Sequence, residues 1–193
     1  MNGVRNILLA GVGGQGTILA GKILSEGLAE AGFDVKMSEI HGMSQRGGNV
    51  STQIRYGDKV FSPVIARHEA DVIAAFEKME ALRWIEYLRP DGKLIANDFE
   101  IYPAPVLMGA AKYPEGILEE LSAKADVLAF RADEIAKEIG NRKSANMVLL
   151  GALVQTMGIG GVPWDEVIRE NVRADYFEVN IKAFEEGKKR ANT

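Results

Sequence analysis

The sequence predicts an α/β fold, with a mostly parallel open sheet, helices on both faces, an inserted β-hairpin and a helical C-terminal part. Short apolar runs of strand length alternate with longer stretches whose apolar residues recur at helical spacing. A glycine-rich turn follows the first of these runs, and from residue 144 onward only helical patterns occur. We expect residues 1–193 to form a single domain, because neither a linker nor an internal repeat divides them.

The first predicted strand and helix flank the glycine-rich turn. Asn6–Ala10 is a short apolar run, which is typical of a buried strand in a parallel sheet. Gln15–Ala31 has apolar residues at helical spacing, and Gly32 ends the pattern. Val35–Ile40 is the second predicted strand.

A β-hairpin is expected next. Val50–Tyr56 alternates apolar and polar residues as a half-buried strand does, and Gly57-Asp58 favours a tight turn. Because Val60–Phe61 follows this turn directly, we expect it to pair back on the preceding strand.

The central part of the chain repeats the strand and helix pattern. Ala70–Phe76 is a candidate buried strand, and Glu77–Leu88 is amphipathic with a helical period. The Arg-Pro-Asp-Gly sequence at residues 89–92 ends that helix in a turn, and Lys93–Asn97 is the next strand. Tyr102–Pro114 is proline-rich, so we expect it to be irregular.

One more strand, Asp126–Phe130, is expected between helices, and the remainder of the chain is predicted to be helical. The predicted helices of this part are Gly116–Ala125, Ala132–Ile139, Ser144–Met157, a segment that starts at Pro163, and Asp175–Arg190.

Composition excludes several classes of function. The net charge of -4 gives no support for binding to nucleic acid or to an anionic membrane. The chain has no cysteine, so it cannot form a disulfide, use a thiol nucleophile or bind an iron–sulfur cluster through thiolates. No signal peptide is recognisable at the N-terminus, and no apolar run reaches the roughly 18 residues of a membrane span. We therefore expect a cytoplasmic protein.

The first motif, at residues 11–16, reads Gly-Val-Gly-Gly-Gln-Gly and lies between the first strand and the first helix. It matches the G-x-G-x-x-G fingerprint of Rossmann-like folds, in which amide N–H groups face an anionic group, usually a phosphate. Its candidate binding residues are Gly11, Gly13, Gly14, Gln15 and Gly16. A dinucleotide site also needs an acidic residue after the second strand, and Glu39 is at about that distance. Glycines are equally common where a turn is simply tight.

The second motif, at residues 41–48, reads His-Gly-Met-Ser-Gln-Arg-Gly-Gly and connects two predicted strands. Core packing does not require a histidine, an arginine and three glycines to gather in a connection. The candidate binding residues here are His41, Ser44, Arg46, Gly47 and Gly48, and Arg46 would offer an anion its planar, permanently charged group. A plain NAD-binding protein would not need this motif. Bracing of a turn by His41, or an ion pair between Arg46 and a surface acid, is the simpler alternative.

Three segments together resemble a known family. They are Ile7–Gly16, Ser38–Val50 and Asp71–Lys78, and further similarity extends through Glu80–Trp84, Asn97-Asp98 and Asn146–Ala152. The chain resembles the gamma-type domain of 2-oxoacid:ferredoxin oxidoreductases, and within that family the beta subunit of indolepyruvate ferredoxin oxidoreductases. The His41–Ser44 part is the more specific one, because related domains that act on other oxoacids keep only an Arg-Gly-Gly like Arg46–Gly48.

This resemblance implies a subunit that is inactive alone, with no catalytic residue and no metal ligand of its own. In the family, a larger partner subunit carries thiamine diphosphate with magnesium and the iron–sulfur clusters. The 2-oxoacid is oxidatively decarboxylated there, the electrons pass to ferredoxin, and the acyl group passes to coenzyme A. The gamma-type domain packs against the partner and helps to form the coenzyme A site, which would place the candidate residues of both motifs there. Whether the lone chain also self-associates stays open.

Two other classes of function are compatible with the sequence. The chain could be a free-standing NAD or FAD oxidoreductase, or a non-catalytic interaction module whose glycine loops only fit a partner. Other conspicuous residues have structural interpretations: Asn97-Asp98 suits a turn, and Trp84 and Trp164 suit the core or a subunit contact.

Overall fold

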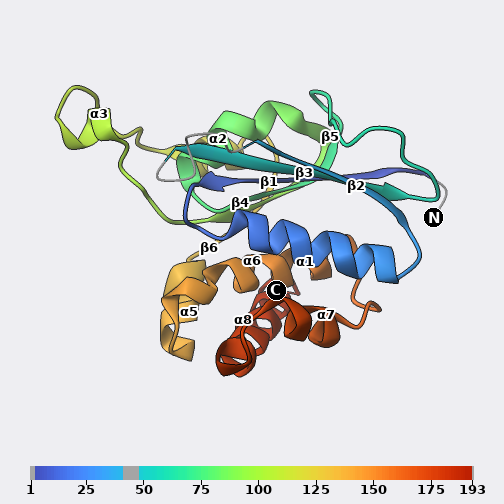
Figure 1. Ribbon diagram of the computed structural model, residues 1–193. Helices are drawn as coiled ribbons and strands as arrows, with labels where there is room; N and C mark the ends of the chain where they lie inside the picture. The colour runs from blue at the N-terminus through green and yellow to red at the C-terminus, as the bar shows by residue number, and fades with distance from the viewer. Residues whose placement is uncertain (1–2, 41–47, 193) are drawn as a thin grey trace.

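The computed structural model describes residues 3–40 and 48–192, and in this part of the chain six strands form one sheet (Figure 1). The strands are β1 (Arg5–Val12), β2 (Asp34–Ile40), β3 (Asn49–Gly57), β4 (Ala70–Ala75), β5 (Leu88–Asn97) and β6 (Asp126–Phe130). Their order across the sheet is β2-β3-β1-β4-β5-β6. β1, β4, β5 and β6 are parallel, β3 is antiparallel to β1, and β2 is antiparallel to β3. Only β3 therefore runs against the common direction, which confirms the predicted mostly parallel sheet.

The inserted hairpin exists, but not where the sequence predicts it. β2 and β3 form the antiparallel pair, and they are connected through residues 41–48. The predicted pairing of Val60–Phe61 is wrong, because β3 already has β2 on one edge and β1 on the other. Val60 instead turns inward, where its N–H donates to the Asp34 carboxylate at 2.8 Å, and Phe61 is 85% exposed.

Helices cover both faces of the sheet, as expected (Figure 1). α2 (Lys78–Trp84) and α4 (Ile117–Ser122) cover one face, over the strands β1 and β4 to β6. The other face carries a thicker layer of helices, which are α1 (Thr17–Glu30), α5 (Ala132–Ile139), α6 (Ala145–Met157), α7 (Trp164–Asn171) and α8 (Phe177–Arg190). Single turns of 3-10 helix also occur, at η2 (Ile85–Tyr87), η3 (Arg142–Ser144) and η4 (Ala174–Tyr176). The helical C-terminal part is therefore confirmed.

β1 lies between two hydrophobic cores, which explains the unbroken apolar run of its residues 7–12. Ile7 and Leu9 point into the larger core, between the sheet and the layer of α1, α6 and α8. Leu8 and Ala10 point to the other face, into the smaller core under α2 and α4. A strand that is buried on both faces has no polar alternation, as in other parallel sheets.

Two glycines let the C-terminal helices α6 and α8 cross closely. A Cβ at Gly151 would overlap the carbonyl oxygen of Phe184, and one at Gly187 would overlap the carbonyl oxygen of Val148. Contact of backbone with backbone at this crossing fixes α8 on α6 and closes the larger core.

The helix predicted for Glu77–Leu88 is shorter in the structure, and β5 starts earlier than expected. α2 ends at Trp84, and Leu88 is already the first residue of β5, paired with Ala70. The Arg-Pro-Asp-Gly segment at residues 89–92 lies inside β5, at a register shift of the β4–β5 pair. Turn residues at a bulge are accommodated in a strand in this way.

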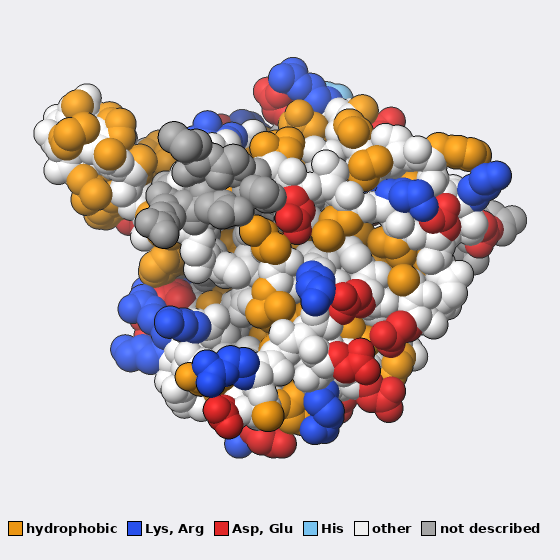
Figure 2. Space-filling model, viewed as in Figure 1, with side chains coloured by type: hydrophobic (Ala, Val, Ile, Leu, Met, Phe, Trp, Pro, Cys, Tyr) orange, Lys and Arg blue, Asp and Glu red, His pale blue; other side chains and the backbone are white. Residues whose placement is uncertain are grey.

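Residues 98–116, between β5 and α4, form an arm that projects from the carboxyl edge of the sheet, at the left of Figure 1. The arm contains α3 (Ala104–Leu107), a single helical turn, and is otherwise irregular, as predicted for Tyr102–Pro114. The hydrophobic side chains at its far end are visible at the upper left of Figure 2.

Candidate functional site

The glycine loop of the first motif lies between β1 and α1, at the carboxyl edge of the sheet. Gly14 and Gly16 have φ values of 99° and 81°, which L side chains rarely adopt. Gly16 is also crowded, because a Cβ there would lie 2.7 Å from Nδ2 of Asn146 on α6. These two glycines are therefore required by the turn and by helix packing, whether or not a ligand binds.

Gln15 belongs to the fold. Its Oε1 accepts from the Val12 N–H at 2.8 Å, and its Nε2 donates to the Phe76 carbonyl at 2.7 Å. The side chain thus bridges the ends of β1 and β4. In open α/β sheets the ligand crevice opens at the point where successive connections go to opposite faces, and here that point lies between β1 and β4. Both polar atoms of the Gln15 side chain are thus used within the fold at this crevice, and its predicted ligand contact stays a prediction.

A second amide closes the same edge one strand further on. Asn97, at the end of β5, donates from Nδ2 to the Phe76 carbonyl at 3.2 Å and accepts at Oδ1 from the Ala132 N–H at 2.8 Å. It is buried and connects β4 with the start of α5. Asn97 therefore serves the fold, but as a bridge at the end of a strand and not in the turn that the sequence suggested.

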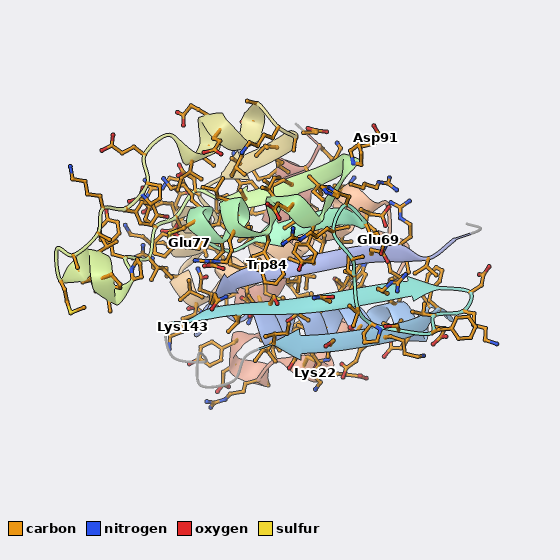
Figure 3. The ribbon with its side chains drawn as sticks, turned by 90° about the horizontal axis from the view of Figure 1, so that it is seen from above. Lys22, Glu69, Glu77, Trp84, Asp91 and Lys143 are labelled. Atoms are coloured by element: carbon orange, nitrogen blue, oxygen red, sulfur yellow. The ribbon has the colours of Figure 1, made fainter. Side chains whose placement is uncertain are left out.

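The open part of the first motif is a hollow on the other side of β1, at the start of α1. Its volume is about 490 Å³, and it is lined by Gly13, Gly14, Gly16, Thr17, Ile18, Leu19, Lys22 and Val50. Within residues 3–40 and 48–192, no side chain caps α1, and its first turn has no acidic residue. The first-turn N–H groups of such a helix attract an anion. Lys22, labelled in Figure 3, adds a charge that is 3.5 Å from Glu26 and 56% exposed.

The two motifs meet at this hollow. The Gly13 N–H donates to the Gly48 carbonyl at 2.9 Å, and Val12 pairs with Asn49 at the start of β3. His41, Ser44, Arg46 and Gly47 lie outside the described residues, so their predicted binding role stays a prediction. β2 ends at Ile40 on the same edge, which brings both ends of the second motif to the side of the glycine loop.

A second, more polar hollow adjoins the first one at Leu19. It measures about 560 Å³ between α6, α7 and the start of α8. Lys143, labelled in Figure 3, and Arg173 supply positive charge to it, and the amides of Asn141, Asn146, Asn171 and Asn180 also line it. No motif marks Lys22, Lys143 or Arg173, because each is an ordinary basic residue in a helix or a loop.

The topology argues against a dinucleotide site. A dinucleotide fold needs the acidic residue on the strand next to β1, where it reaches the ribose. Glu39 lies on β2, and β3 separates β2 from β1. At a strand spacing of about 4.8 Å, Glu39 is two strands, about 10 Å, from the strand that leads into the glycine loop.

Charged residues at the ends of β4 and β5 neutralise one another. Lys78 Nζ lies 2.7 Å from Glu100 Oε1 and 3.2 Å from Asp98 Oδ1. Burial alone lowers the pKa of Lys78, but the hydrogen bonds to Glu100 and Asp98 outweigh it and raise that pKa above its usual value. Hydrogen bonds from Lys78 and Tyr102 lower the pKa of Glu100. Lys78 and Glu100 therefore stay ionised near neutral pH, and their ion pair braces the root of the arm.

Both tryptophans serve packing. Trp164 is buried, donates from Nε1 to the Ile159 carbonyl at 2.9 Å and packs on Gly27 of α1. Trp84 lies beside the smaller core with its ring 4.9 Å from that of Tyr87. Neither forms a stacking platform in the hollows described above.

The described residues contain neither a cluster of metal-ligating side chains nor a membrane-spanning helix. No group of three or more His, Asp or Glu side chains is placed to hold a metal ion there. No helix in that part of the chain combines the length and apolar character of a membrane span.

Comparisons with known proteins agree on one kind of relative. The model of the pyruvate ferredoxin/flavodoxin oxidoreductase family matches residues 6–190. The chain is 42% identical to indolepyruvate oxidoreductase subunit IorB of Pyrococcus horikoshii, over 96% of this chain and 95% of that protein. Among solved structures, the keto/oxoacid ferredoxin oxidoreductase gamma subunit of Geobacter sulfurreducens PCA is similar with a TM-score of 0.75 and 26% identity, covering 98% of this chain and 97% of that one.

A longer protein contains the same fold. It is the 2-oxoglutarate:ferredoxin oxidoreductase of Magnetococcus marinus, solved with 2-oxoglutarate, coenzyme A and succinyl-CoA bound. The TM-score is 0.76 at 22% identity, and the match covers all of this chain but 32% of that one. The fold therefore occurs both as a separate subunit and as about a third of a larger polypeptide.

Proposed function

Because the chain belongs to the pyruvate ferredoxin/flavodoxin oxidoreductase family, we propose that it is the small subunit of an indolepyruvate ferredoxin oxidoreductase, acting on indolepyruvate or another aryl pyruvate. The observation that carries the proposal is the 42% identity to an indolepyruvate oxidoreductase subunit along nearly the whole of both chains. The complete enzyme would oxidatively decarboxylate the 2-oxoacid, reduce ferredoxin and form an acyl-CoA. The chain contributes one subunit to that reaction.

The larger partner subunit supplies the redox chemistry. The chain has no cysteine, so the thiolates that bind iron–sulfur clusters come from another polypeptide. Thiamine diphosphate and its magnesium are assigned to the same partner. The role of the small subunit is then to bind the partner and to help to position coenzyme A. Three further expectations remain predictions, namely a single domain, contact with ferredoxin through the complex, and a cytoplasmic location.

Coenzyme A is the cofactor for which this chain offers a fitting surface. The uncapped start of α1, with Lys22 beside it, suits a phosphate group, and Ile18, Leu19 and Val50 give the same hollow an apolar wall. The adjoining hollow, with Lys143 and Arg173, could receive a second anionic group of so long a molecule. When bound, coenzyme A supplies the thiol that accepts the acyl group.

The second motif completes this proposed site. Gly48 is joined to Gly13 by a hydrogen bond, so the connection that precedes Gly48 starts and ends beside the first hollow. We assign His41, Ser44 and Arg46 to contacts with coenzyme A or with the partner subunit at this edge. Of the first motif, the backbone N–H groups near Gly14 and Gly16 make the contact, because the Gln15 side chain is used within the fold.

Steady-state kinetics of the assembled complex test this proposal. Lys22→Ala and Arg46→Ala should each raise KM for coenzyme A about fivefold, which corresponds to a loss of about 1 kcal/mol, and leave KM for the 2-oxoacid unchanged. Lys93→Ala is the control, because Lys93 is an exposed lysine near the opposite edge, 3.3 Å from Asp126. Unchanged coenzyme A kinetics in both variants would remove this chain from the coenzyme A site and favour a purely structural subunit.

A further inference from the structure

The arm of residues 98–116 is held rigidly at its root. The buried Glu77 accepts hydrogen bonds from the Tyr113 hydroxyl and from the Ile101 N–H, the latter at 3.3 Å. The rings of Tyr102 and Tyr113, one on each side of the arm, meet edge to face at 5.3 Å. In Figure 3, Glu77 lies on the side of the arm, far from Glu69 and Asp91 at the opposite edge. The root is thus a part of the folded domain.

The tip of the arm, residues 104–111, has the composition of a core but lies in solvent. It reads Ala-Pro-Val-Leu-Met-Gly-Ala-Ala and has no charged residue. Leu107 and Met108 are 71% and 74% exposed, and they lie at the C-terminal end of α3, a helical turn of four residues. A turn this short is not stable by its own propensity, and a braced arm does not need an apolar end for its own folding. Figure 2 shows this end as a hydrophobic knob apart from the body.

We propose that the tip of the arm is an anchor that inserts into an uncharged, apolar recess on the larger subunit. The partner's existence rests on the proposed function, but the assignment of the contact to the arm does not. Exposed Leu and Met side chains suit an apolar recess, because Met adapts its shape and removal of both side chains from water is favourable. An uncharged tip also excludes a charged surface as its main target.

The chain length of the longer relative supports this choice of occupant. In the Magnetococcus marinus protein the same fold makes up 32% of one polypeptide, so additional protein is attached to it covalently. In a separate small subunit, surface contacts must replace that covalent connection. The arm projects from the same edge of the sheet as the glycine loop, so that docking of its tip would hold the proposed coenzyme A site against the partner.

A second copy of this chain fits the arm less well. A stable interface buries about 1,200–2,000 Å² in total, and two tips of eight residues packed on each other cannot supply that area. The tip needs a wider surface around it, which a larger subunit provides.

The test measures association of the small and large subunits directly. The double variant Leu107→Asp/Met108→Asp should raise the dissociation constant of the two subunits at least about 10-fold, because each Asp would have to be buried without a partner charge. The melting temperature of the lone chain should not fall, since both side chains are mostly exposed. The control is the double variant Phe61→Asp/Val64→Asp, which changes two similarly exposed apolar residues in the connection between β3 and β4. This variant should bind the large subunit with the affinity of the wild type. Leu107→Met/Met108→Leu should also associate normally.

Each outcome decides between alternatives. Equal affinity of the Asp double variant and the wild type would overturn the arm proposal while leaving the proposed function intact. Loss of self-association of the lone chain, with unchanged binding to the large subunit, would assign the arm to a second copy instead. If no larger subunit co-purifies with the wild-type chain, the proposed function itself fails.

Discussion

Replacing Gln15 with alanine separates a structural glutamine from a ligand-binding one. In the structure, Gln15 Oε1 accepts from the Val12 N–H at 2.8 Å and Nε2 donates to the Phe76 carbonyl at 2.7 Å. Both backbone groups belong to buried residues. The Phe76 carbonyl keeps a second donor in Asn97, but the Val12 N–H loses the acceptor that Gln15 supplies.

The expected cost follows from these two bonds. An unsatisfied buried donor costs about 1–3 kcal/mol, and the loss of a bond to a carbonyl that retains another partner costs about 1 kcal/mol. Gln15→Ala should therefore lower the free energy of unfolding by about 2–4 kcal/mol, unless water enters the space and reduces the loss. Gln15→Glu keeps an acceptor for Val12 but places a carboxylate oxygen against the Phe76 carbonyl, so it should also destabilise.

Urea-induced unfolding, followed by circular dichroism and by tryptophan fluorescence, measures this loss. Gln155→Ala is the matched control, because Gln155 forms an exposed hydrogen bond to Asn192 at 2.7 Å; it should change stability by less than about 0.5 kcal/mol. A Gln15→Ala variant that is as stable as this control, but raises KM for coenzyme A in the complex, would contradict the structural role of Gln15. That result would make Gln15 a ligand residue.

Three further predictions concern packing and buried charge. Gly187→Ala should lower the free energy of unfolding by about 3 kcal/mol or more, because its Cβ overlaps the Val148 carbonyl, while Gly160→Ala, with open space around it, should be nearly neutral in the same urea titration. Asp71→Asn should cost about 1.5–3 kcal/mol, since the buried carboxylate lies 2.6 Å from Arg89 and accepts from a backbone N–H, and a smaller loss would show that water compensates the arginine. Burial raises the pKa of Glu80, so the wild type loses stability as pH rises through that pKa. The free energy of unfolding of Glu80→Gln should therefore increase relative to that of the wild type between pH 4 and 8. A constant difference between the two proteins across this range would contradict the raised pKa.

The local patterns of the sequence predicted most of the strands and helices. Apolar runs such as Asn6–Ala10 and Lys93–Asn97 lie inside observed strands, and the helix predicted for Ser144–Met157 differs from α6 by one residue. These predictions succeeded because burial on one or both faces leaves a direct mark on the residue pattern.

Strand pairing was not predictable in the same way. The chain does bend at Asp58, directly after β3, but β3 already has two neighbours, a fact that only the complete sheet order reveals. The Arg-Pro-Asp-Gly segment at residues 89–92 likewise predicts a turn, but it lies within β5, where the pairing with β4 shifts register at a bulge. Long-range pairing outweighs local turn preference at both places.

The candidate site was predictable in position but not in composition. The fingerprint located the hollow at the start of α1, whereas Lys22 and the basic residues of the adjoining hollow carry no motif. Gln15 shows in addition that a polar residue within a binding motif can serve the fold, which the motif alone does not reveal.

The antiparallel strand β3 is the feature that converts a dinucleotide-like motif into a different kind of site. In a doubly wound sheet, the glycine loop faces a crevice between two parallel strands and an acidic residue on the next strand. Here Gln15 fills the crevice toward β4, and β3 occupies the place beside β1 where the acidic strand would lie. The uncapped start of α1 consequently lies beside the first residues of β3, in the hollow that Val50 also lines, and Gly48 meets Gly13 next to it. Under the proposed function, a ligand at this loop would lie where the small subunit meets its partner, which would give a subunit, more than a self-contained enzyme, a reason to keep the fingerprint.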